Sequence, residues 1–526
     1  WLSESFAEYL GFKVLADATA FTGAWAACAL DRKIRGYDAD QRASTHPVAP
    51  DPAAVSDTDI ALASYDDISY AKGAAALRQL VAWLGWPAFL AGVNDYFARY
   101  RFGSATLDDL LGCLSRAAGD AGEGADVGEW AAAWLRSAGV DIVSVSRPEP
   151  PGRVGCVSHD GTRPHRLLIG VYDEGPDGLV LRGRFPVPVP ADATAVVLPA
   201  AATWPEPALL LPNDGDLSYA KVRLDPASHA ALAASLGRLP DPLSRAVAWT
   251  AVRDLVRDGE LAPRQYLALA ARHLPAETES SIAGHVIGYA RWTIADRYLP
   301  PGQRDAALAA ITSLCRDLLS PHPAGDGGEV RLVAVRGLID SAAGPDDVSA
   351  LWSWLAAGRV PGGPDLDARL RWQILARLTV LGAASRAEIE DEAGRDPQDP
   401  DGRLAAARCR AALPDAGAKR AAWAVLAEGA LSGYELAATA EGFWQADQAE
   451  LLAGYVPGYF AALPALDGGL ARVWCRHGFP HYAAETATVL AGERCLEAGG
   501  ITGSLRRLLA DQLEDLRRAL ARRSAT

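Results

Sequence analysis

The stretch "DIVSVS", residues 141–146, sets valines and serines in alternation. This period of two is typical of a β-strand with one buried face. Before this stretch, apolar side chains recur at the spacing of one helix face, as in Leu2, Phe6, Tyr9 and Leu10. The change of period therefore places the first strand of the chain at the start of this stretch.

Further short apolar runs follow the first one: "LLIGVY", "GLVLRGRFPVPV", "TAVVL" and "ALLLP". Turn-forming clusters separate them, such as "DEGPDG" at residues 173–178. Several short strands with Pro and Gly between them predict a small β-sandwich over residues 141–224. Pro186, Pro188 and Pro190 cannot donate to a neighbouring strand, so we expect their run at an edge of a sheet or outside it.

The segments on both sides of the β region have a helical pattern. One helix starts with Asp241 as its N-cap and Pro242 as its first residue. Helices of similar length follow, and no strict repeat of tetratricopeptide or ankyrin type joins them. We therefore predict a multidomain, mainly α-helical fold. It comprises a helical part over residues 1–140, the β-sandwich over residues 141–224, and an irregular, α-solenoid-like stack of helical hairpins over residues 225–526.

The composition narrows the class of protein. The formal net charge of -14 argues against a nucleic-acid partner, which needs clustered Lys and Arg side chains. The uncharged stretches near the start are shorter than the roughly 20 apolar residues of a membrane helix, so we expect no membrane span. The seven cysteines form no C-x-x-C pair and fit reduced thiols in a cytoplasm. We expect a soluble cytoplasmic protein, with a monomer favoured over an oligomer.

No methionine occurs among the 526 residues, so a translation start cannot lie within them. We therefore expect this chain to be the C-terminal portion of a longer protein.

Most motifs of known chemistry are absent. The sequence contains no H-E-x-x-H, no G-x-S-x-G, no P-loop and no dinucleotide fingerprint after a strand, so no cofactor-binding residues are predicted. The nine histidines show no complete metal site by their spacing. The closest pair, His477 and His481, is interrupted by Pro480, which disfavours the regular helix that would bring the two rings together.

Two segments resemble the aminopeptidase N family of zinc metallopeptidases: "WLSESFAEYLG" at residues 1–11 and "YDDISYAKGAAALRQL" at residues 65–80. Four later segments resemble, in order, the end of that family's catalytic domain, its β-sandwich and the opening of its helical C-terminal domain. They are "FGSATLDDLL", "EWAAAWLRSAGVD", "LLLPNDGDLSYAKVRLD" and "PLSRAVAWTAVRDLVRDGEL". The resemblance is strong to about Leu261 and concerns helical architecture beyond it. It implies that residues 1–140 are the C-terminal helical part of a thermolysin-like catalytic domain.

In this family the first motif is usually W-L-N-E, and its glutamate is the third protein ligand of the catalytic zinc after the two histidines of H-E-x-x-H. The resemblance therefore implies that Glu4 is a zinc ligand in the complete enzyme. Ser3 replaces the usual asparagine and can change the hydrogen bonding around that ligand. Without the resemblance, Glu4 is a solvated carboxylate that the helix dipole favours in a first turn, with Ser3 as the N-cap.

In the family, the tyrosine of S-Y-x-K-G points its hydroxyl at the scissile carbonyl oxygen and stabilises the negative charge that develops there. Tyr70 matches this tyrosine, and Tyr65 matches a second one found near the site in some members, with a weaker case for a direct role. Without the family, both tyrosines fit amphipathic core positions with locally satisfied hydroxyls. Gly73 fits a close approach of this helix to a neighbour, and Lys72 fits a solvated or locally paired charge.

The resemblance implies a hydrolase of peptide catabolism, a zinc aminopeptidase that removes N-terminal residues from peptides through metal-activated water. Two alternatives stay open: a non-catalytic member that binds peptides or partners through the helical domain, and a structural solenoid in which the motifs are coincidental. The family's G-x-M-E-N loop cannot occur here in its usual form, because the chain has no methionine.

The complete zinc site would need ligands that this chain does not supply in a recognisable motif. Glu4 is a single carboxylate, and Glu8, one turn further along the same helix, fits a solvated position. We therefore expect this chain alone neither to hold zinc tightly nor to hydrolyse aminoacyl substrates.

Overall fold

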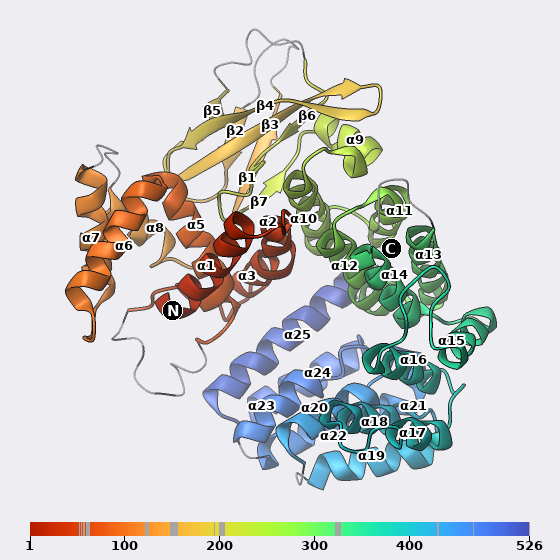
Figure 1. Ribbon diagram of the computed structural model, residues 1–526. Coiled ribbons are helices and arrows are strands. Elements are labelled where there is room, and N and C mark those ends of the chain that lie inside the picture. The colour runs from red at the N-terminus through yellow and green to blue at the C-terminus, as the bar shows by residue number, and fades with distance from the viewer. Residues whose placement is uncertain are drawn as a thin grey trace. The chain divides into compact units, whose positions relative to one another are not determined.

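The structure is a computed structural model of the 526-residue chain. It describes residues 1–51, 53, 55, 58, 64–120, 126–147, 156–193, 195–198, 206–320, 328–428, 431–466 and 468–524. The chain forms two compact units, Trp1–Asp254 and Leu255–Thr526. Figure 1 shows helices and two sheets in the first unit and helices in the second. A mainly helical, multidomain fold with a small β region is therefore confirmed, whereas the three-part division at residues 140 and 224 stays a prediction.

Several helices of the first unit, among them α1, α3 and α5 to α8, share one hydrophobic core. On α5, one buried face holds Ala74, Leu77, Leu80 and Leu84, which follow the helical period of the sequence. The helices before the sheets are α1 (Leu2–Ala18), α2 (Ala24–Ala27), η1 (Cys28–Lys33), α3 (Ile34–Asp40), η3 (Ile68–Lys72), α5 (Gly73–Leu84), α6 (Trp86–Tyr100), α7 (Leu107–Asp120) and α8 (Val127–Trp134). Of these, η1 and η3 are π-helical turns, a widened form that often occurs at functional sites.

The β region consists of two sheets. One has the order β5-β2-β1-β7, with β1 and β7 parallel, and the other is antiparallel with the order β4-β3-β6. Both sheets contribute to one core, the first through Val143, Val145 and Val157 and the second through Leu167 and Ile169. The strands are β1 (Asp141–Ser146), β2 (Cys156–His159), β3 (His165–Gly175), β4 (Gly178–Val189), β5 (Val196–Val197), β6 (Leu209–Leu211) and β7 (Ala220–Arg223).

The sequence pattern predicts most of these strands. β1 and β4 have the bounds of the runs "DIVSVS" and "GLVLRGRFPVPV". β4 is an edge strand that contains Pro186 and Pro188, as expected for residues that cannot donate to a ladder. The pattern does not predict β2 and β7, which are only 4 residues long each.

Two helices follow the sheets and start at capping residues. They are α9 (Pro226–Ser235), extended by η5 (Leu236–Arg238), and α10 (Pro242–Asp258). The backbone N–H of Leu243 donates to Oδ1 of Asp241 at 2.9 Å, so the predicted N-cap of α10 is confirmed. Gly259 follows with a φ of 86°, a left-handed conformation that ends a helix at little cost only when the side chain is absent.

The second unit is a succession of helices. Contacts join α12 to α14, α14 to α16, α16 to α18 and α18 to α20, so that alternate helices are neighbours as in stacks of helical hairpins. The helices are α11 (Pro263–His273), η6 (Leu274–Ala276), α12 (Ser280–Gly288), η7 (Tyr289–Tyr298), α13 (Pro301–Leu319), α14 (Gly328–Ser341), α15 (Pro345–Ala357), α16 (Ala368–Val380), α17 (Arg386–Ala393), α18 (Pro400–Ala412), α19 (Ala416–Glu428), α20 (Gly433–Phe443), η8 (Ala446–Gln448), α21 (Ala449–Leu452), η9 (Ala453–Tyr455), α22 (Val456–Ala462), η10 (Leu463–Ala465), α23 (Gly468–His477), α24 (Thr486–Ala498) and α25 (Gly503–Ser524).

A buried ion cluster ties three parts of this second unit together. The carboxylate of Asp447, in η8, lies 2.9 Å from the guanidinium groups of both Arg304 on α13 and Arg377 on α16. Burial acts to raise the pKa of Asp447, but the charges and hydrogen bonds of Arg377 and Arg304 outweigh it and hold that pKa well below its usual range.

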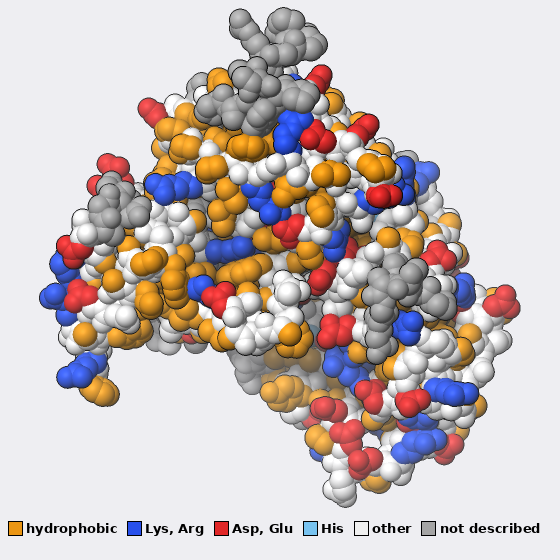
Figure 2. All heavy atoms as spheres, turned by 45° about the horizontal axis from the view of Figure 1, so that its top comes forward, with side chains coloured by type: hydrophobic (Ala, Val, Ile, Leu, Met, Phe, Trp, Pro, Cys, Tyr) orange, Lys and Arg blue, Asp and Glu red, His pale blue; other side chains and the backbone are white. Residues whose placement is uncertain are grey.

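The surface mixes charges of both signs. On the face seen in Figure 2, Lys and Arg side chains are interspersed with Asp and Glu side chains. The prediction that no nucleic acid binds stays a prediction.

None of the helices in the described part of the chain combines the length and apolar character that crossing a bilayer requires.

Candidate functional site

The two matched motifs lie against each other. Glu4 is in the first turn of α1 and Tyr70 is in η3, and α1 contacts both η3 and α5. The hydroxyl of Ser5 donates to the carbonyl oxygen of Ser69 at 2.7 Å. A Cβ atom at Gly73 would lie 1.9 Å from Oγ of Ser5, so only glycine permits this approach of the two helices, as the sequence predicts.

This contact brings the predicted site residues together. Partial desolvation, a hydrogen bond with Glu4 and the negative charges of Glu4 and Tyr65 raise the pKa of Tyr70. A phenol with a raised pKa keeps its proton at neutral pH, so its hydroxyl donates to the carboxylate of Glu4. Tyr65 is 59% exposed. All three residues therefore share one region of the first unit, while their catalytic and metal-binding roles stay predictions.

The start of η3 is fixed by a local capping arrangement. Oδ1 of Asp66 accepts from the backbone N–H groups of Ile68 at 2.9 Å and Ser69 at 3.3 Å. Oδ2 of the same carboxylate lies 2.9 Å from Nε2 of His46. These contacts fix the N-terminal end of η3, the turn that carries Tyr70, while its C-terminal end continues into α5.

Lys72 differs from the prediction of a solvated or locally paired charge. Its ammonium group is buried and lies 2.8 Å from the carboxylate of Asp40 on α3. It also donates to the carbonyl oxygens of Ser137 at 3.0 Å and Gly139 at 3.2 Å. Burial lowers the pKa of Lys72, and the charge of Asp40 opposes that effect. The prediction was wrong because its partners come from distant parts of the chain, which the local sequence does not show.

Glu8 is not solvated as predicted. Its side chain is 7% exposed and forms an ion pair with Arg32 in η1. The positive charge of Arg32 also acts to lower the pKa of Tyr70, so this arginine lies near the site as well. Because the carboxylate of Glu8 is already paired, it is not available as a base beside Glu4.

The arrangement offers a carboxylate that can bind a cation and a phenol that can donate to an oxygen carrying negative charge. A catalytic zinc takes three protein ligands and keeps one open position, so Glu4 alone does not make a complete site.

The histidines His477 and His481 do not lie on one regular helix, as Pro480 predicts, because α23 ends at His477. Nδ1 of His477 lies 2.9 Å from Oε1 of Glu441.

A second group of ionisable side chains was missed by the sequence reasoning. Asp141, His159 and His165 each offer one atom suited to a metal ion, and these atoms lie within 4.8 Å of one another. One signal was present: Asp141 and His165 occupy the buried phase of β1 and β3, where the alternation calls for apolar side chains. His159 gave no signal, because β2 was not predicted.

Comparisons with known proteins agree with the two motifs. The sequence model of the peptidase family M1 domain matches residues 1–134, and that of the ERAP1-like C-terminal domain matches residues 209–518. Aminopeptidase N of Streptomyces lividans is 33% identical over 548 residues, which cover 100% of this chain and 62% of that protein.

Two further relatives match a shorter part of the chain. The leucyl aminopeptidase of Saccharolobus solfataricus is 31% identical over 146 residues, 28% of this chain and 18% of that protein. The mitochondrial aminopeptidase 2 of Saccharomyces cerevisiae is 30% identical over 146 residues, 28% of this chain and 14% of that protein. The chain thus spans less than two thirds of the length of each of these relatives.

Proposed function

The chain belongs to the aminopeptidase N family of peptidases, and from this premise we propose that it supplies one part of a zinc aminopeptidase site. The complete protein would hydrolyse N-terminal residues from peptides. The observation that carries this proposal is the close contact of the two motifs on which the resemblance rests: Ser5, next to Glu4, donates to the carbonyl oxygen of Ser69, next to Tyr70, at 2.7 Å.

Glu4 fits the role of a zinc ligand. It lies half-buried in the first turn of α1. We propose that the other two ligands are histidines of an H-E-x-x-H motif, which does not occur among these 526 residues. When bound, zinc would supply a Lewis acid and lower the pKa of a water molecule.

Tyr70 would act as a hydrogen-bond donor to the substrate. A tyrosine phenol keeps its proton at neutral pH, and the raised pKa of Tyr70 acts in the same direction. Its hydroxyl can move from Glu4 to the carbonyl oxygen of the scissile bond, where negative charge develops. The buried pair of Lys72 and Asp40 would hold the helix that carries Tyr70, so that the donor is positioned before substrate binds.

The test uses a protein that contains this chain together with an upstream H-E-x-x-H segment. Tyr70→Phe should lower kcat about 100-fold or more on an aminoacyl amide with little change in KM, because the lost hydrogen bond forms mainly in the transition state. Tyr100→Phe is the matched control, since it removes a hydroxyl that bonds Asp109 on the neighbouring helix and should leave kcat unchanged. Near-wild-type kcat for Tyr70→Phe would contradict the proposal.

A second candidate function, peptide binding without catalysis, is supported by a pocket in the second unit. Its wall combines aromatic side chains with several guanidinium groups, which suit a peptide carboxylate or acidic side chains. The arginines are Arg336, Arg369 and Arg476, together with Arg291, Arg377 and Arg408, which already pair with carboxylates of the chain. The wall also holds acidic side chains, among them Asp399 and Asp401, and aromatic ones that include Trp292, Trp372 and Trp444. If the complete protein lacks H-E-x-x-H, binding of an acidic peptide that Arg369→Ala weakens would favour this function.

We also propose peptides as the substrates, a cytoplasmic location and a monomeric state. The scattered cysteines support the location, and size-exclusion chromatography with light scattering tests the monomeric state.

A further inference from the structure

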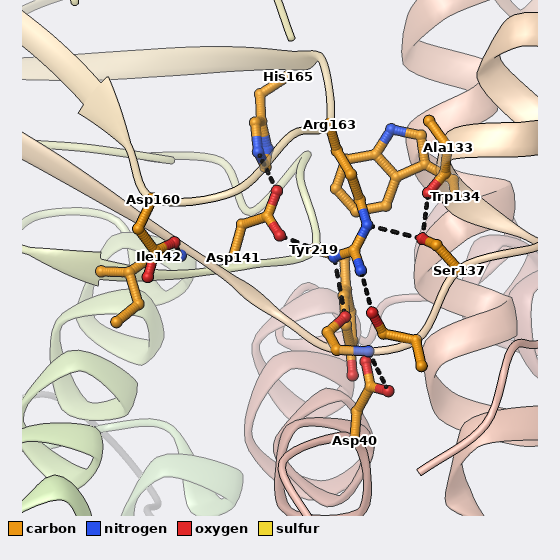
Figure 3. A network of polar contacts seen from close by, with 12 residues as sticks. Asp40, Ala133, Trp134, Ser137, Asp141, Ile142, Asp160, Arg163, His165 and Tyr219 are labelled. Atoms are coloured by element: carbon orange, nitrogen blue, oxygen red, sulfur yellow. Dashed lines mark hydrogen bonds and ion pairs between the residues drawn. The ribbon is translucent and has the colours of Figure 1, made fainter. Parts of the chain in front are cut away.

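Three side chains from both sheets meet at one end of the β region. Asp141 begins β1, His159 ends β2 and His165 begins β3. One ligand atom from each lies within 4.8 Å of the others. Figure 3 shows the ring of His165 directed at the carboxylate of Asp141. β1 and β2 belong to one sheet and β3 to the other, so the group bridges the sandwich.

When the ring of His165 is neutral, its hydrogen bonds leave the nitrogen that faces this group without a proton. Ser218 Oγ donates to Oε1 of Gln79 at 2.9 Å, and that oxygen is identified because it also accepts from the backbone N–H of Tyr219. The hydroxyl proton is therefore in use, and Nδ1 of His165, 2.8 Å from the same Oγ, must donate to it. In the neutral ring, Nε2 then presents a lone pair to Oδ2 of Asp141, 3.1 Å away.

His159 is oriented in the same sense. Its Nε2 lies 3.2 Å from the carbonyl oxygen of Pro190, which can only accept, so Nε2 carries the proton. Nδ1 is then the lone-pair nitrogen, and this atom is buried without a hydrogen-bond partner in the described structure. Each ring thus donates one N–H to an oxygen and keeps its other nitrogen as a lone-pair donor, which is how metal-ligating histidines are held.

The carboxylate of Asp141 completes the group. Its Oδ1 accepts from Arg163 at 2.8 Å, which leaves Oδ2 directed at His165. The backbone of Gly161 covers this carboxylate so closely that a Cβ atom there would lie 2.1 Å from its Cγ. Arg163 is the positive charge that faces the site, and its bond to Oδ1 fixes the carboxylate without using the inward oxygen.

We propose that Asp141, His159 and His165 bind a zinc ion that ties the two sheets together. Two imidazole nitrogens and one carboxylate oxygen are a donor set that suits zinc, with a water molecule as the fourth ligand, whereas magnesium and calcium prefer oxygen donors. The 3.1 Å between His165 and Asp141 is close to the separation of about 3.3 Å between two ligands of a tetrahedral zinc with bonds of about 2.0–2.1 Å. With His165 neutral, the metal would replace an otherwise unfavourable contact between the lone pair of Nε2 and the carboxylate of Asp141.

From the sequence, this chain alone is not expected to hold zinc tightly, because Glu4 is a single carboxylate and the nine histidines show no complete metal site by their spacing. The proposed site departs from that expectation, because His159 and His165 match no metal-site motif by their spacing but lie together in the fold. This site shares no ligand with Glu4 or with a catalytic zinc bound there. Its presence therefore neither requires nor supports peptidase activity.

The test measures zinc in the 526-residue chain after incubation with zinc chloride and gel filtration into metal-free buffer. Wild type and Glu4→Gln should each keep about one zinc per chain, whereas His159→Ala should keep less than a tenth of that. Zinc should also raise the melting temperature of wild type and Glu4→Gln but not that of His159→Ala. His159 suits this substitution because it is only half-buried, so the buried contacts of His165 with Ser218 stay intact.

A rescue variant keeps the test decisive if His159→Ala does not fold. His159→Cys supplies a thiolate in place of the imidazole, so it should retain zinc and give a thiolate-to-metal charge-transfer band with Co²⁺ that wild type lacks. The proposal would be overturned if wild-type protein kept no zinc and its melting temperature did not change with Zn²⁺ or Co²⁺. That result would indicate that His165 is doubly protonated and donates to Asp141. Equal zinc content in wild type and a folded His159→Ala would overturn the proposal too.

Discussion

The contact between Gly73 and Ser5 holds the two site motifs together, and Gly73→Ala tests it directly. A Cβ atom at this position would lie 1.9 Å from Oγ and 2.9 Å from Cβ of Ser5, and 3.3 Å from Cγ1 of Val48. Rotation of the serine side chain can relieve the first contact but not the second. The substitution must therefore both break a hydrogen bond and push α1 away from α5.

The size of the effect follows from three contributions. Loss of the hydrogen bond from Ser5 to Ser69, 2.7 Å long in the structure, costs about 1 kcal/mol. Overpacking at a close helix contact costs about 1–3 kcal/mol. Replacing glycine by alanine in a helix regains about 1 kcal/mol. The net loss of stability at this contact is therefore about 1–3 kcal/mol.

Hydrogen–deuterium exchange read by mass spectrometry measures this loss locally. Amides in peptides from α1 and α5 should exchange roughly 5- to 150-fold faster in Gly73→Ala, because 1.4 kcal/mol corresponds to a factor of ten in an opening equilibrium. Peptides from α18, in the other compact unit, should be unchanged.

Gly11→Ala on α1 is the matched control. A Cβ atom there meets nothing within 4 Å, so this variant should gain about 0.5–1 kcal/mol and slow the exchange of α1. The double variant Ser5→Ala/Gly73→Ala removes the shorter contact and should lose less than the sum of the single losses. If Gly73→Ala exchanged as slowly as Gly11→Ala, the packing of the two motifs would not be as described.

Three further predictions concern charges. Asp40→Asn leaves the buried ammonium of Lys72 without its ion partner, so denaturant melts should show a loss of about 3–5 kcal/mol, and a loss below about 1 kcal/mol would contradict the pairing. The folded-state pKa of Asp447 is lowered, so its contribution to stability is complete above about pH 4 and is lost as the pH falls through that lowered pKa. Asp447→Asn should therefore make the free energy of unfolding less dependent on pH in acid. An unchanged pH dependence would count against the two arginine contacts of Asp447. Glu4→Gln should lower the pKa of Tyr70 but keep the part of the rise that comes from desolvation. The phenolate absorbance that Tyr70→Phe removes reports this pKa, and an unaltered pKa would show that the two side chains do not meet.

Local periodicity was sufficient to predict the fold where an element is long or strictly alternating. β1 and β4 have the bounds of their sequence runs, and α10 starts after its predicted cap. β2 and β7 were missed because each has only 4 residues, too few for a period to emerge, and their strand conformation depends on pairing with β1. The bounds of β1 and β4 could therefore be predicted from the local sequence, whereas the pairing of β2 and β7 with β1 could not.

The candidate site divides in the same way. The nearness of Glu4 and Tyr70 could be expected only from two motifs recognised together, because no spacing rule joins residues so far apart in the chain. The burial of Lys72 and of Glu8 was missed since each is paired with a residue from another helix. Long-range ion pairs leave no periodic trace in a sequence, whereas the buried-phase positions of Asp141 and His165 do.

The connection between α8 and β1 joins the two sites. Its residues Ser137 and Gly139 offer their carbonyl oxygens to Lys72, and the backbone N–H of Gly139 donates to Asp40 at 2.8 Å. From the other side, Arg163 donates to the carbonyl oxygen of Gly139 at 2.8 Å and to Oγ of Ser137 at 2.9 Å. Figure 3 shows this guanidinium between Ser137 and the start of β1.

A continuous set of contacts therefore runs from the proposed zinc to the proposed catalytic tyrosine. Arg163 bonds both Asp141 and the connection, the connection bonds Lys72, and Lys72 is two positions from Tyr70 on the same turn. A metal that fixes Asp141 would limit the movement of Arg163 and, through the shared carbonyl of Gly139, that of the turn carrying Tyr70. Coupling of this kind is established only when a change at one site alters the other. Removal of zinc should accordingly speed amide exchange in residues 137–141 and in η3, and should leave the exchange of α6, which takes no part in these contacts, as it was.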